Sequence, residues 1–227
     1  MLNDEVNAHL AVLERTYFDI PDALVSSAIT DHQTSHDRGE GLGTLRAFDL
    51  ARSVGYGEVE YRVMPEVASL LDLSAGDSFI DFGCGIGCFL LFLAMNYPKC
   101  NFVGVEVVAS RYDIAVQARH RLSVSLPNFE HRVHLILGDY LSRTAQMEIN
   151  LTRLSVAFMS DMLLPEALHH ELVQLIVSRC PALRRIVKCK SMPRHFRGNF
   201  EEKGKIMVQC SWSATPVAFY VYDRINC

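Results

Sequence analysis

The sequence predicts an α/β fold of the doubly wound, Rossmann-like kind, built on a mostly parallel sheet. Apolar runs of strand length alternate with segments of helical periodicity between residues 78 and 189. A glycine-rich turn follows the first of these runs. Two closing strands, at 205–212 and 217–222, are joined by so few residues that they must form an antiparallel hairpin. We therefore expect a seven-stranded sheet with one reversed strand.

The composition is typical of one globular domain with an appendage. The chain has 227 residues, of which 49% are hydrophobic, so a sizeable core is possible. No apolar run reaches the roughly 18 residues of a membrane-spanning helix, and the start MLNDEVNAHL does not resemble a signal peptide. We expect a soluble, intracellular protein without membrane contact. The formal net charge of −4 argues against a protein that coats nucleic acid with its whole surface.

The 7 cysteines indicate a reducing compartment. They form no CxxC pair, and several stand in apolar segments, which favours buried free thiols. No spacing of histidine and cysteine suggests a zinc site, so we expect no metal.

Residues 1–50 are predicted to form a helical N-terminal extension, and residues 51–227 the α/β domain. Val6, Leu10, Leu13 and Tyr17 recur at helical spacing, and Pro21 opens a second helical segment. Residues 31–43 are polar and rich in histidine and glycine, which is typical of a loop. The extension shows no recognisable chemistry.

The elements of the domain follow in order along the chain. An amphipathic helix is expected at 59–73, and further helices at 88–97, 109–124 and 165–179. Strands are expected at 78–82, 101–106, 133–137, 154–159 and 185–189, before the closing hairpin.

The most specific motif is the glycine turn after the first strand, which reads Phe79-Ile80-Asp81-Phe82-Gly83-Cys84-Gly85-Ile86-Gly87. Alternate glycines let the backbone approach a ligand where a Cβ would collide, and the next helix offers its free N–H groups. A dinucleotide fingerprint would need glycine where Cys88 stands. The Asp81 carboxylate also suits a cofactor with an α-amino group better than one with a pyrophosphate, whose charge it would repel. The alternative is an ordinary tight strand–helix turn.

Two further carboxylates follow the second and third strands. In open α/β sheets the ligand lies beyond the carboxyl ends of the strands, so Glu106 could accept hydrogen bonds from both hydroxyls of a ribose. Asp139 could accept from the exocyclic amine of adenine, while Tyr140 packs on the ring. Taken singly, Glu106 could instead be a solvated loop acid, and Asp139 an N-cap of the next helix.

The ordered set of motifs resembles the disruptor-of-telomeric-silencing family, non-SET lysine methyltransferases that modify the globular core of histone H3. The resemblance covers about residues 50–224, and in compactness the chain is most similar to the short kinetoplastid forms. Besides the motifs above, it rests on Tyr56-Gly57-Glu58, Arg185-Ile186-Val187, Ser211-Trp212-Ser213, Pro216-Val217-Ala218-Phe219-Tyr220 and Asp223-Arg224. It implies a class I methyltransferase fold, S-adenosyl-L-methionine as the cofactor and lysine N-methylation of histone H3.

The resemblance also implies roles for single residues. The loop around Tyr56 would close over the methionine end of the cofactor, and Trp212 and Phe219 would line a channel for the target lysine. The implied cofactor contacts are Tyr56, Gly57, Glu58, Asp81, Gly83, Gly85, Gly87, Cys88, Glu106, Asp139, Tyr140 and Ser160. The implied catalytic positions are Tyr56, Ser160, Asp161, Trp212 and Phe219.

The chain departs from the family pattern in three places, which cover four positions. Cys88 stands where a glutamine commonly follows the third glycine, and Ser160-Asp161 replaces an Asn-Asn pair. Phe219 stands where a tyrosine usually lines the channel, and loss of that hydroxyl could alter how many methyl groups are added.

A basic run near the C-terminus suggests a partner. It comprises Arg184, Arg185, Lys188, Lys190, Arg194, Arg197, Lys203 and Lys205. Such a run could contact nucleosomal DNA or an acidic histone surface, or it could be a solvated face. His169-His170 lies on a predicted helix and is expected at the surface. We expect a nuclear chromatin enzyme acting on histone H3 in nucleosomes; the alternative is a class I methyltransferase of another protein or a small molecule.

Overall fold

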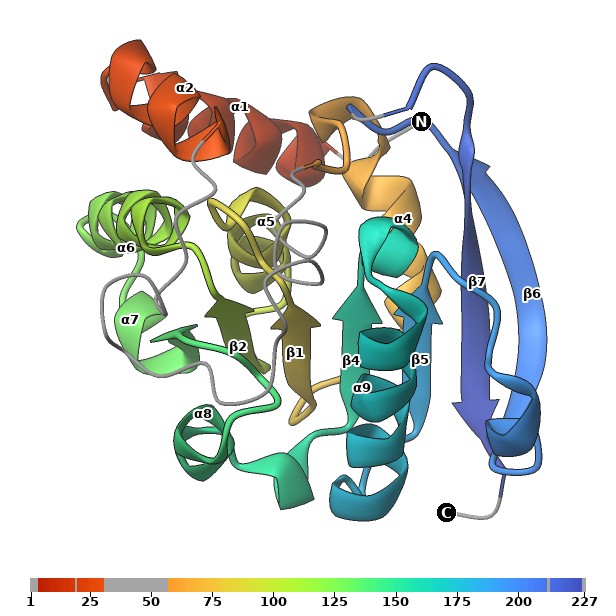
Figure 1. The fold of residues 1–227 in the computed structure, drawn as a ribbon. Helices are drawn as coiled ribbons and strands as arrows, with labels where there is room; N and C mark the ends of the chain where they lie inside the picture. Colours follow the sequence, from red (N-terminus) through yellow and green to blue (C-terminus); the bar gives the residue numbers. More distant parts are fainter. Residues whose placement is uncertain (1–3, 19, 31–56, 212, 226–227) are drawn as a thin grey trace.

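The computed structural model describes residues 4–18, 20–30, 57–211 and 213–225 (Figure 1). Within them, seven strands form one sheet in the order β3-β2-β1-β4-β5-β7-β6. The strands are β1 (Ser78–Phe82), β2 (Asn101–Glu106), β3 (Val133–Leu137), β4 (Val156–Met159), β5 (Arg185–Lys188), β6 (Phe200–Val208) and β7 (Val217–Arg224). Strands β1 to β5 pair in parallel, and β7 is antiparallel to both β5 and β6. The predicted mostly parallel sheet with a C-terminal antiparallel hairpin is confirmed.

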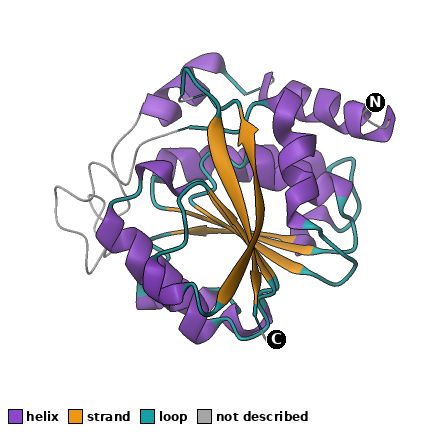
Figure 2. Cartoon of the chain, turned by 90° about the vertical axis from the view of Figure 1, so that its right-hand side faces the viewer, coloured by secondary structure: helices purple, strands orange, loops and turns teal. Residues whose placement is uncertain are grey.

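Helices cover both faces of this sheet (Figure 2). They are α1 (Asp4–Phe18), α2 (Asp22–Thr30), α4 (Met64–Leu71), α5 (Cys88–Asn96), α6 (Ala109–Ser123), α7 (Phe129–Arg132), α8 (Arg143–Glu148) and α9 (Glu166–Arg179). Short 3₁₀ turns are η2 (Tyr61–Val63), η3 (Leu151–Arg153), η4 (Asp161–Leu163) and η5 (Arg194–Phe196). No helix in the described ranges is long and apolar enough to cross a lipid bilayer.

Alternation along the strands divides the core into two apolar layers. Phe79 packs into the cluster formed with α1, α4, α5 and α6, whereas its neighbour Ile80 packs into the cluster with α8 and α9. Successive strand side chains point to opposite faces of a sheet, so a strand buried on both sides is apolar throughout. Gly104 of β2 suits this packing, since a Cβ there would lie 2.6 Å from Leu90 Cδ2 and 2.8 Å from Cys84 Sγ and would displace these buried side chains.

The helix predicted at 59–73 is shorter in the structure. Val59 forms an isolated antiparallel bridge with Cys210, and a 3₁₀ turn follows before α4 begins at Met64. Pro65 occupies the first turn of α4, where its missing N–H costs no helical hydrogen bond. The helix ends at Asp72, which takes the left-handed conformation with φ 49°.

Strand β6 and helix α8 also differ from the sequence prediction. Strand β6 starts five residues earlier than expected, at Phe200, and ends at Val208 rather than 212. Its first half carries exposed charged side chains, because β6 lies at the edge of the sheet, and its pairing shifts register between Glu202 and Gly204. Helix α8 was not predicted; Ser142 caps it by accepting a hydrogen bond from the Ala145 amide at 3.2 Å.

The predicted N-terminal helices are present as α1 and α2. Helix α1 packs on α5 and α6, and α2 packs on α6. Leu13, Tyr17 and Ile20 are buried in the same cluster as Phe79. The predicted loop at 31–43 lies outside the described residues.

Candidate active site

A cavity opens beyond the carboxyl ends of β1 to β4, where ligands bind in open α/β sheets. Its volume is about 1240 Å³ including the open mouth. The predicted site residues that line it are Gly57, Glu58, Asp81, Gly83, Gly85, Glu106, Asp139, Tyr140, Ser160 and Asp161. Two predicted residues, Tyr56 and Trp212, lie outside the described part of the chain.

The glycine turn forms one wall of the cavity. Gly83, Gly85 and Gly87 have φ of 89°, 58° and 87°, a left-handed conformation that glycine adopts at no steric cost. The amides of Gly83 and Cys84 donate to the Val105 carbonyl at 2.9 and 3.0 Å, which ties the turn to β2. Gly83 and Gly85 line the cavity. Gly87 is the N-cap residue of α5 and does not line the cavity.

Glu106, at the end of β2, holds that turn from the other side. Its Oε2 accepts from the Gly85 amide at 2.8 Å, and its Oε1 accepts from the amides of Val107 and Val108 at 3.0 and 2.8 Å. A carboxylate offers about four acceptor sites, so these three amides leave about one for a ligand. Burial raises the pKa of Glu106, while the backbone donors and the Arg111 charge oppose that rise.

Asp81 has a different environment. Its side chain is buried at the cavity wall, and no described residue donates a hydrogen bond to it. Burial, reinforced by the nearby Glu106 charge, raises the pKa of Asp81 to about 8. The carboxyl group is therefore mostly protonated at neutral pH, and a cationic ligand group beside it would favour its ionised form.

Asp139 presents an unpaired acceptor. Its Oδ1 accepts from the Leu141 amide at 2.8 Å, whereas its Oδ2 is buried and has no hydrogen-bond partner among the described residues. Burying an acceptor without a partner costs roughly 1–3 kcal/mol, so such an atom beside a cavity fits a ligand donor. Tyr140 packs edge-on against Phe82 with ring centroids 5.5 Å apart. The N-cap alternative for Asp139 is wrong, since Ser142 caps α8.

The segments that flank Tyr56 and Trp212 lie side by side. The Glu58 amide donates to Ser211 Oγ at 2.9 Å, and the Ser211 amide donates to the Glu58 carbonyl at 3.1 Å. These bonds extend the bridge between Val59 and Cys210. These bonds join the loop that carries Gly57 and Glu58 to the segment between β6 and β7.

Asp161 joins the ends of β4 and β5. Its Oδ1 accepts from the amides of Cys189 and Lys190 at 2.8 and 2.9 Å, and its Oδ2 lies 2.6 Å from Lys188 Nζ. Ser160 Oγ lies 4.0 Å from Cys189 Sγ. Asp161 therefore shapes the cavity wall while its charge is balanced inside the protein.

Lys188 and His169 complete a buried polar cluster that the sequence prediction missed. Lys188 Nζ contacts His169 Nε2 at 2.7 Å and donates to the Lys190 carbonyl at 2.8 Å, so with Asp161 its ammonium has three acceptors. Burial lowers the pKa of Lys188, and the Asp161 charge opposes that shift. Burial and the Lys188 charge lower the pKa of His169. His169 was expected at the surface, but it is 1% exposed, so that prediction is wrong. The sequence did hold one indication of a buried polar cluster, namely the charged Lys188 within an apolar strand segment.

Besides Gly87, two predicted contacts lie away from the cavity. Phe219 is fully buried and stacks on Phe158 at 5.6 Å, so Phe158 lines the cavity and Phe219 supports it from behind. Cys88 is buried in the first turn of α5, with its Sγ 3.5 Å from the Tyr61 hydroxyl. Neither side chain is among the described residues that line the cavity.

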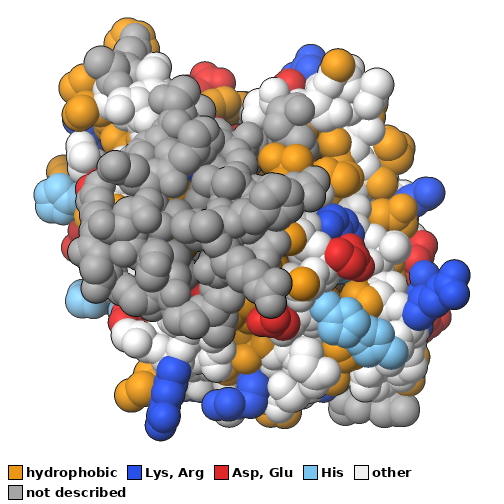
Figure 3. Space-filling view, viewed as in Figure 1, with side chains coloured by type: hydrophobic (Ala, Val, Ile, Leu, Met, Phe, Trp, Pro, Cys, Tyr) orange, Lys and Arg blue, Asp and Glu red, His pale blue; other side chains and the backbone are white. Residues whose placement is uncertain are grey.

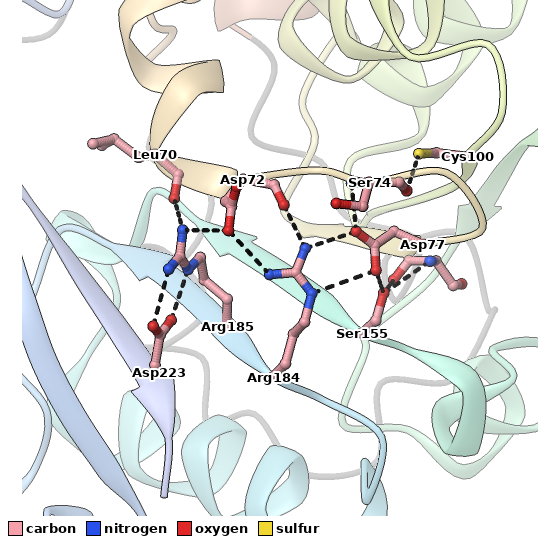
Figure 4. A network of polar contacts seen from close by, with 10 residues as sticks. Leu70, Asp72, Ser74, Asp77, Cys100, Ser155, Arg184, Arg185 and Asp223 are labelled. Carbon is pink, nitrogen blue, oxygen red and sulfur yellow. Dashed lines mark hydrogen bonds and ion pairs between the residues drawn. The ribbon is translucent and has the colours of Figure 1, made fainter. Parts of the chain in front are cut away.

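The basic run does not form one surface. Arg184 pairs with Asp77 at 2.7 Å, and Arg185 pairs with Asp223 through two bonds of 2.7 and 2.9 Å (Figure 4). These pairs lie at the amino ends of β1 and β5, whereas the cavity lies beyond the carboxyl ends of the parallel strands.

Two lysines of the run are also engaged internally. Lys188 is fully buried, and Lys190 donates to the Leu164 carbonyl. Arg194 and Arg197 remain exposed. On the face in Figure 3 the described basic side chains are scattered among acidic and apolar ones. The predicted DNA contact through Lys188 is wrong, because this side chain is fully buried beside Asp161. Arg184 and Arg185 pair with carboxylates of the fold, and a DNA contact through them stays a prediction.

The architecture and the position of the cavity define a class I methyltransferase fold. The solved structures that the chain resembles include a magnesium protoporphyrin IX methyltransferase from Synechocystis with bound S-adenosylmethionine, at TM-score 0.55 and 13% identity, covering 86% of this chain and 93% of that one. Another is an RNA methyltransferase from Salinibacter ruber with S-adenosylhomocysteine, at TM-score 0.54 and 14% identity, covering 75% and 95%. These likenesses support the fold.

The family follows from the sequence itself. The model of the family described as "Histone methylation protein DOT1" matches residues 40–222, so the chain belongs to this family. A Drosophila melanogaster relative named "Histone-lysine N-methyltransferase, H3 lysine-79 specific" is 26% identical over 189 residues, covering 74% of this chain and 10% of that protein. A relative of the same name from Emericella nidulans is 26% identical over 138 residues, covering 58% of the chain and 26% of the relative. The chain thus spans a tenth to a quarter of these relatives.

Proposed function

We propose that this chain transfers a methyl group from S-adenosylmethionine to a lysine side chain of histone H3. Membership of the histone methylation family supports the reaction class, and the names of the relatives make H3 lysine-79 the first site to test. The main structural observation in favour of this cofactor is the buried, unpaired Oδ2 of Asp139 beside a left-handed glycine turn.

The residues of the cavity fit this cofactor. The adenine amine would donate to Asp139, and the α-ammonium group would pair with Asp81, whose carboxylate lacks a described donor. Glu106 would use its remaining acceptor site for one ribose hydroxyl, rather than binding both as a free carboxylate could. The bound cofactor supplies an electrophilic methyl group on a sulfonium.

The lysine must lose its proton before transfer. A free lysine has a pKa of about 10.4, so deprotonation at pH 7 costs roughly 4.6 kcal/mol. Burial in a channel with apolar walls and the adjacent sulfonium charge lower such a pKa by several units, so a general base is not required. Phe89, Phe158 and Met159 give the cavity its apolar wall beside Ser160. In-line positioning of nitrogen, methyl and sulfur would supply the rest of the acceleration.

The finer proposals concern location and partner. A histone substrate implies a nuclear, chromatin-associated protein, and the substrate would be histone H3 within nucleosomes. Arg194 and Arg197 are exposed members of the basic run that could contact nucleosomal DNA.

The test uses radiolabelled S-adenosylmethionine with three acceptors: recombinant nucleosomes, free histone H3 and a small-molecule extract. Label on histone H3, mapped to one lysine by mass spectrometry, is expected. Label only in the extract would establish a small-molecule methyltransferase instead. Calorimetry with S-adenosylhomocysteine separates these outcomes from a failure of the cofactor assignment, which would give no binding.

A further inference from the structure

The glycine turn is held from behind by helix α1. Tyr17, near the end of α1, donates a hydrogen bond from its hydroxyl to the Ile86 carbonyl at 2.6 Å, across 69 residues of sequence. Both groups are buried. The same hydroxyl lies 3.7 Å from the position that a Cβ on Gly87 would occupy. Tyr17 thus contacts the turn on the side facing away from the cavity.

Helix α2 makes a second contact with the same site. Arg111, in the first turn of α6, lines the cavity, and its Nε donates to the Ala28 carbonyl at 3.1 Å. Its charge opposes the rise in the pKa of Glu106. The two helices therefore reach both halves of the candidate cofactor site: the glycine turn through Tyr17 and the surroundings of Glu106 through Arg111.

We propose that α1 and α2 complete the cofactor site, with Tyr17 as a positioning residue that holds the glycine turn in its binding conformation. This inference rests on the proposed cofactor. A turn with three left-handed glycines has many accessible conformations when it is unsupported, and a ligand that needs one of them must bear the cost of ordering it. The Tyr17 hydrogen bond reduces that cost before the ligand binds.

The proposal predicts reciprocity between the two sides of the turn. If docked α1 raises the affinity for the cofactor, then the bound cofactor must stabilise docked α1 by the same factor. Truncation of the N-terminal helices would therefore weaken binding although neither helix supplies a described side chain to the cavity wall.

The first experiment is calorimetry of Tyr17→Phe with S-adenosylhomocysteine. Loss of one hydrogen bond predicts affinity weakened roughly three- to tenfold, with KM for S-adenosylmethionine raised and kcat changed less. Tyr112→Phe is the matched control, because Tyr112 packs against the same apolar cluster and its hydroxyl bonds to no described residue. Its affinity should equal that of the parent protein.

A purely structural role for Tyr17 predicts a lower melting temperature with unchanged affinity, and that result would overturn the inference. Hydrogen exchange on the unmodified protein gives an independent measurement. Adding S-adenosylhomocysteine should slow exchange in peptides covering residues 4–18; unchanged exchange there, with protection of the glycine turn, would also overturn it. Absence of any binding by the unmodified protein would instead refute the proposed function.

Discussion

At the scale of single residues, the three carboxylates at the edge of the sheet differ in their remaining bonding capacity. Glu106 is occupied by three backbone amides, Asp139 is half satisfied, and Asp81 has no described donor. A carboxylate occupied by backbone mainly fixes the local chain, whereas one with unpaired oxygens is suited to a ligand. Ligand affinity should therefore depend more directly on Asp139 and Asp81.

Asp139→Asn tests the expected contribution of Asp139 to ligand binding. The asparagine oxygen can keep the bond to the Leu141 amide, but its NH₂ group would face the ligand amine with a donor. Loss of a charged hydrogen bond worth about 1.5–3 kcal/mol predicts affinity for S-adenosylhomocysteine weakened roughly 10- to 100-fold. Calorimetry measures it, and Asp113→Asn on the exposed side of α6 serves as control. Equal affinities for the two variants would exclude Asp139 from the site.

We predict that Asp81 releases its proton when the cofactor binds. Its pKa is raised to about 8, so the free protein carries most of this proton at pH 7. A ligand ammonium group beside the carboxylate favours the ionised form and lowers that pKa, so binding at pH 7 should release close to one proton. Calorimetry in buffers of different ionisation enthalpy counts the protons. Asp81→Asn should abolish the release; an unchanged count would assign the proton to another group.

At the scale of elements, the sequence predicted the sheet well and the site partly. Strands such as β1 are buried on both faces and mostly apolar, so their pattern is strong, whereas the start of edge strand β6 shows no such pattern. The glycine turn and Asp139 were recognisable because they follow predicted strands. The pairing of Lys188 with Asp161 and His169 depends on three separate elements meeting, which no local pattern records.

That buried pair gives a prediction about the junction of β4 and β5. Lys188→Met removes the cation and leaves the Asp161 charge buried, which should destabilise the protein by about 3–5 kcal/mol. Adding Asp161→Asn removes that charge, while its side-chain oxygen can still accept from the Cys189 and Lys190 amides. The double variant should recover most of the loss. Urea denaturation measures the free energy of unfolding, and no recovery would show that the charges are not coupled.

At the scale of the whole molecule, the fold engages half of the basic run in internal contacts. Arg184 and Arg185 neutralise acids at one edge of the sheet, and Lys188 does so in the interior. Charge counted along the sequence therefore overstates the charge available to a partner. Exposed contacts depend on salt, whereas internal pairs are screened much less, so a binding role can be tested separately from a folding role.

Among the exposed members of the basic run, Arg194 and Arg197 lie in and directly after η5, which packs on α9, and are the candidates for a nucleosome contact that we test. Reversing both to glutamate should slow methylation of nucleosomes strongly, because each lost phosphate contact removes attraction and counterion release. Methylation of free histone H3 should suffer less, since that substrate brings no DNA. The defect should also shrink as salt rises, because exposed charges are screened over about 8 Å at physiological ionic strength.

Initial rates on both substrates at two salt concentrations measure this effect, with circular dichroism to confirm folding. Reversal of the exposed Lys99 and Arg153, which directly precede β2 and β4, provides a control with the same change in net charge. A general effect of net charge would slow both double variants alike. If instead the Arg194 and Arg197 variant slows both substrates by the same factor at both salts, these arginines serve the enzyme itself rather than its contact with DNA.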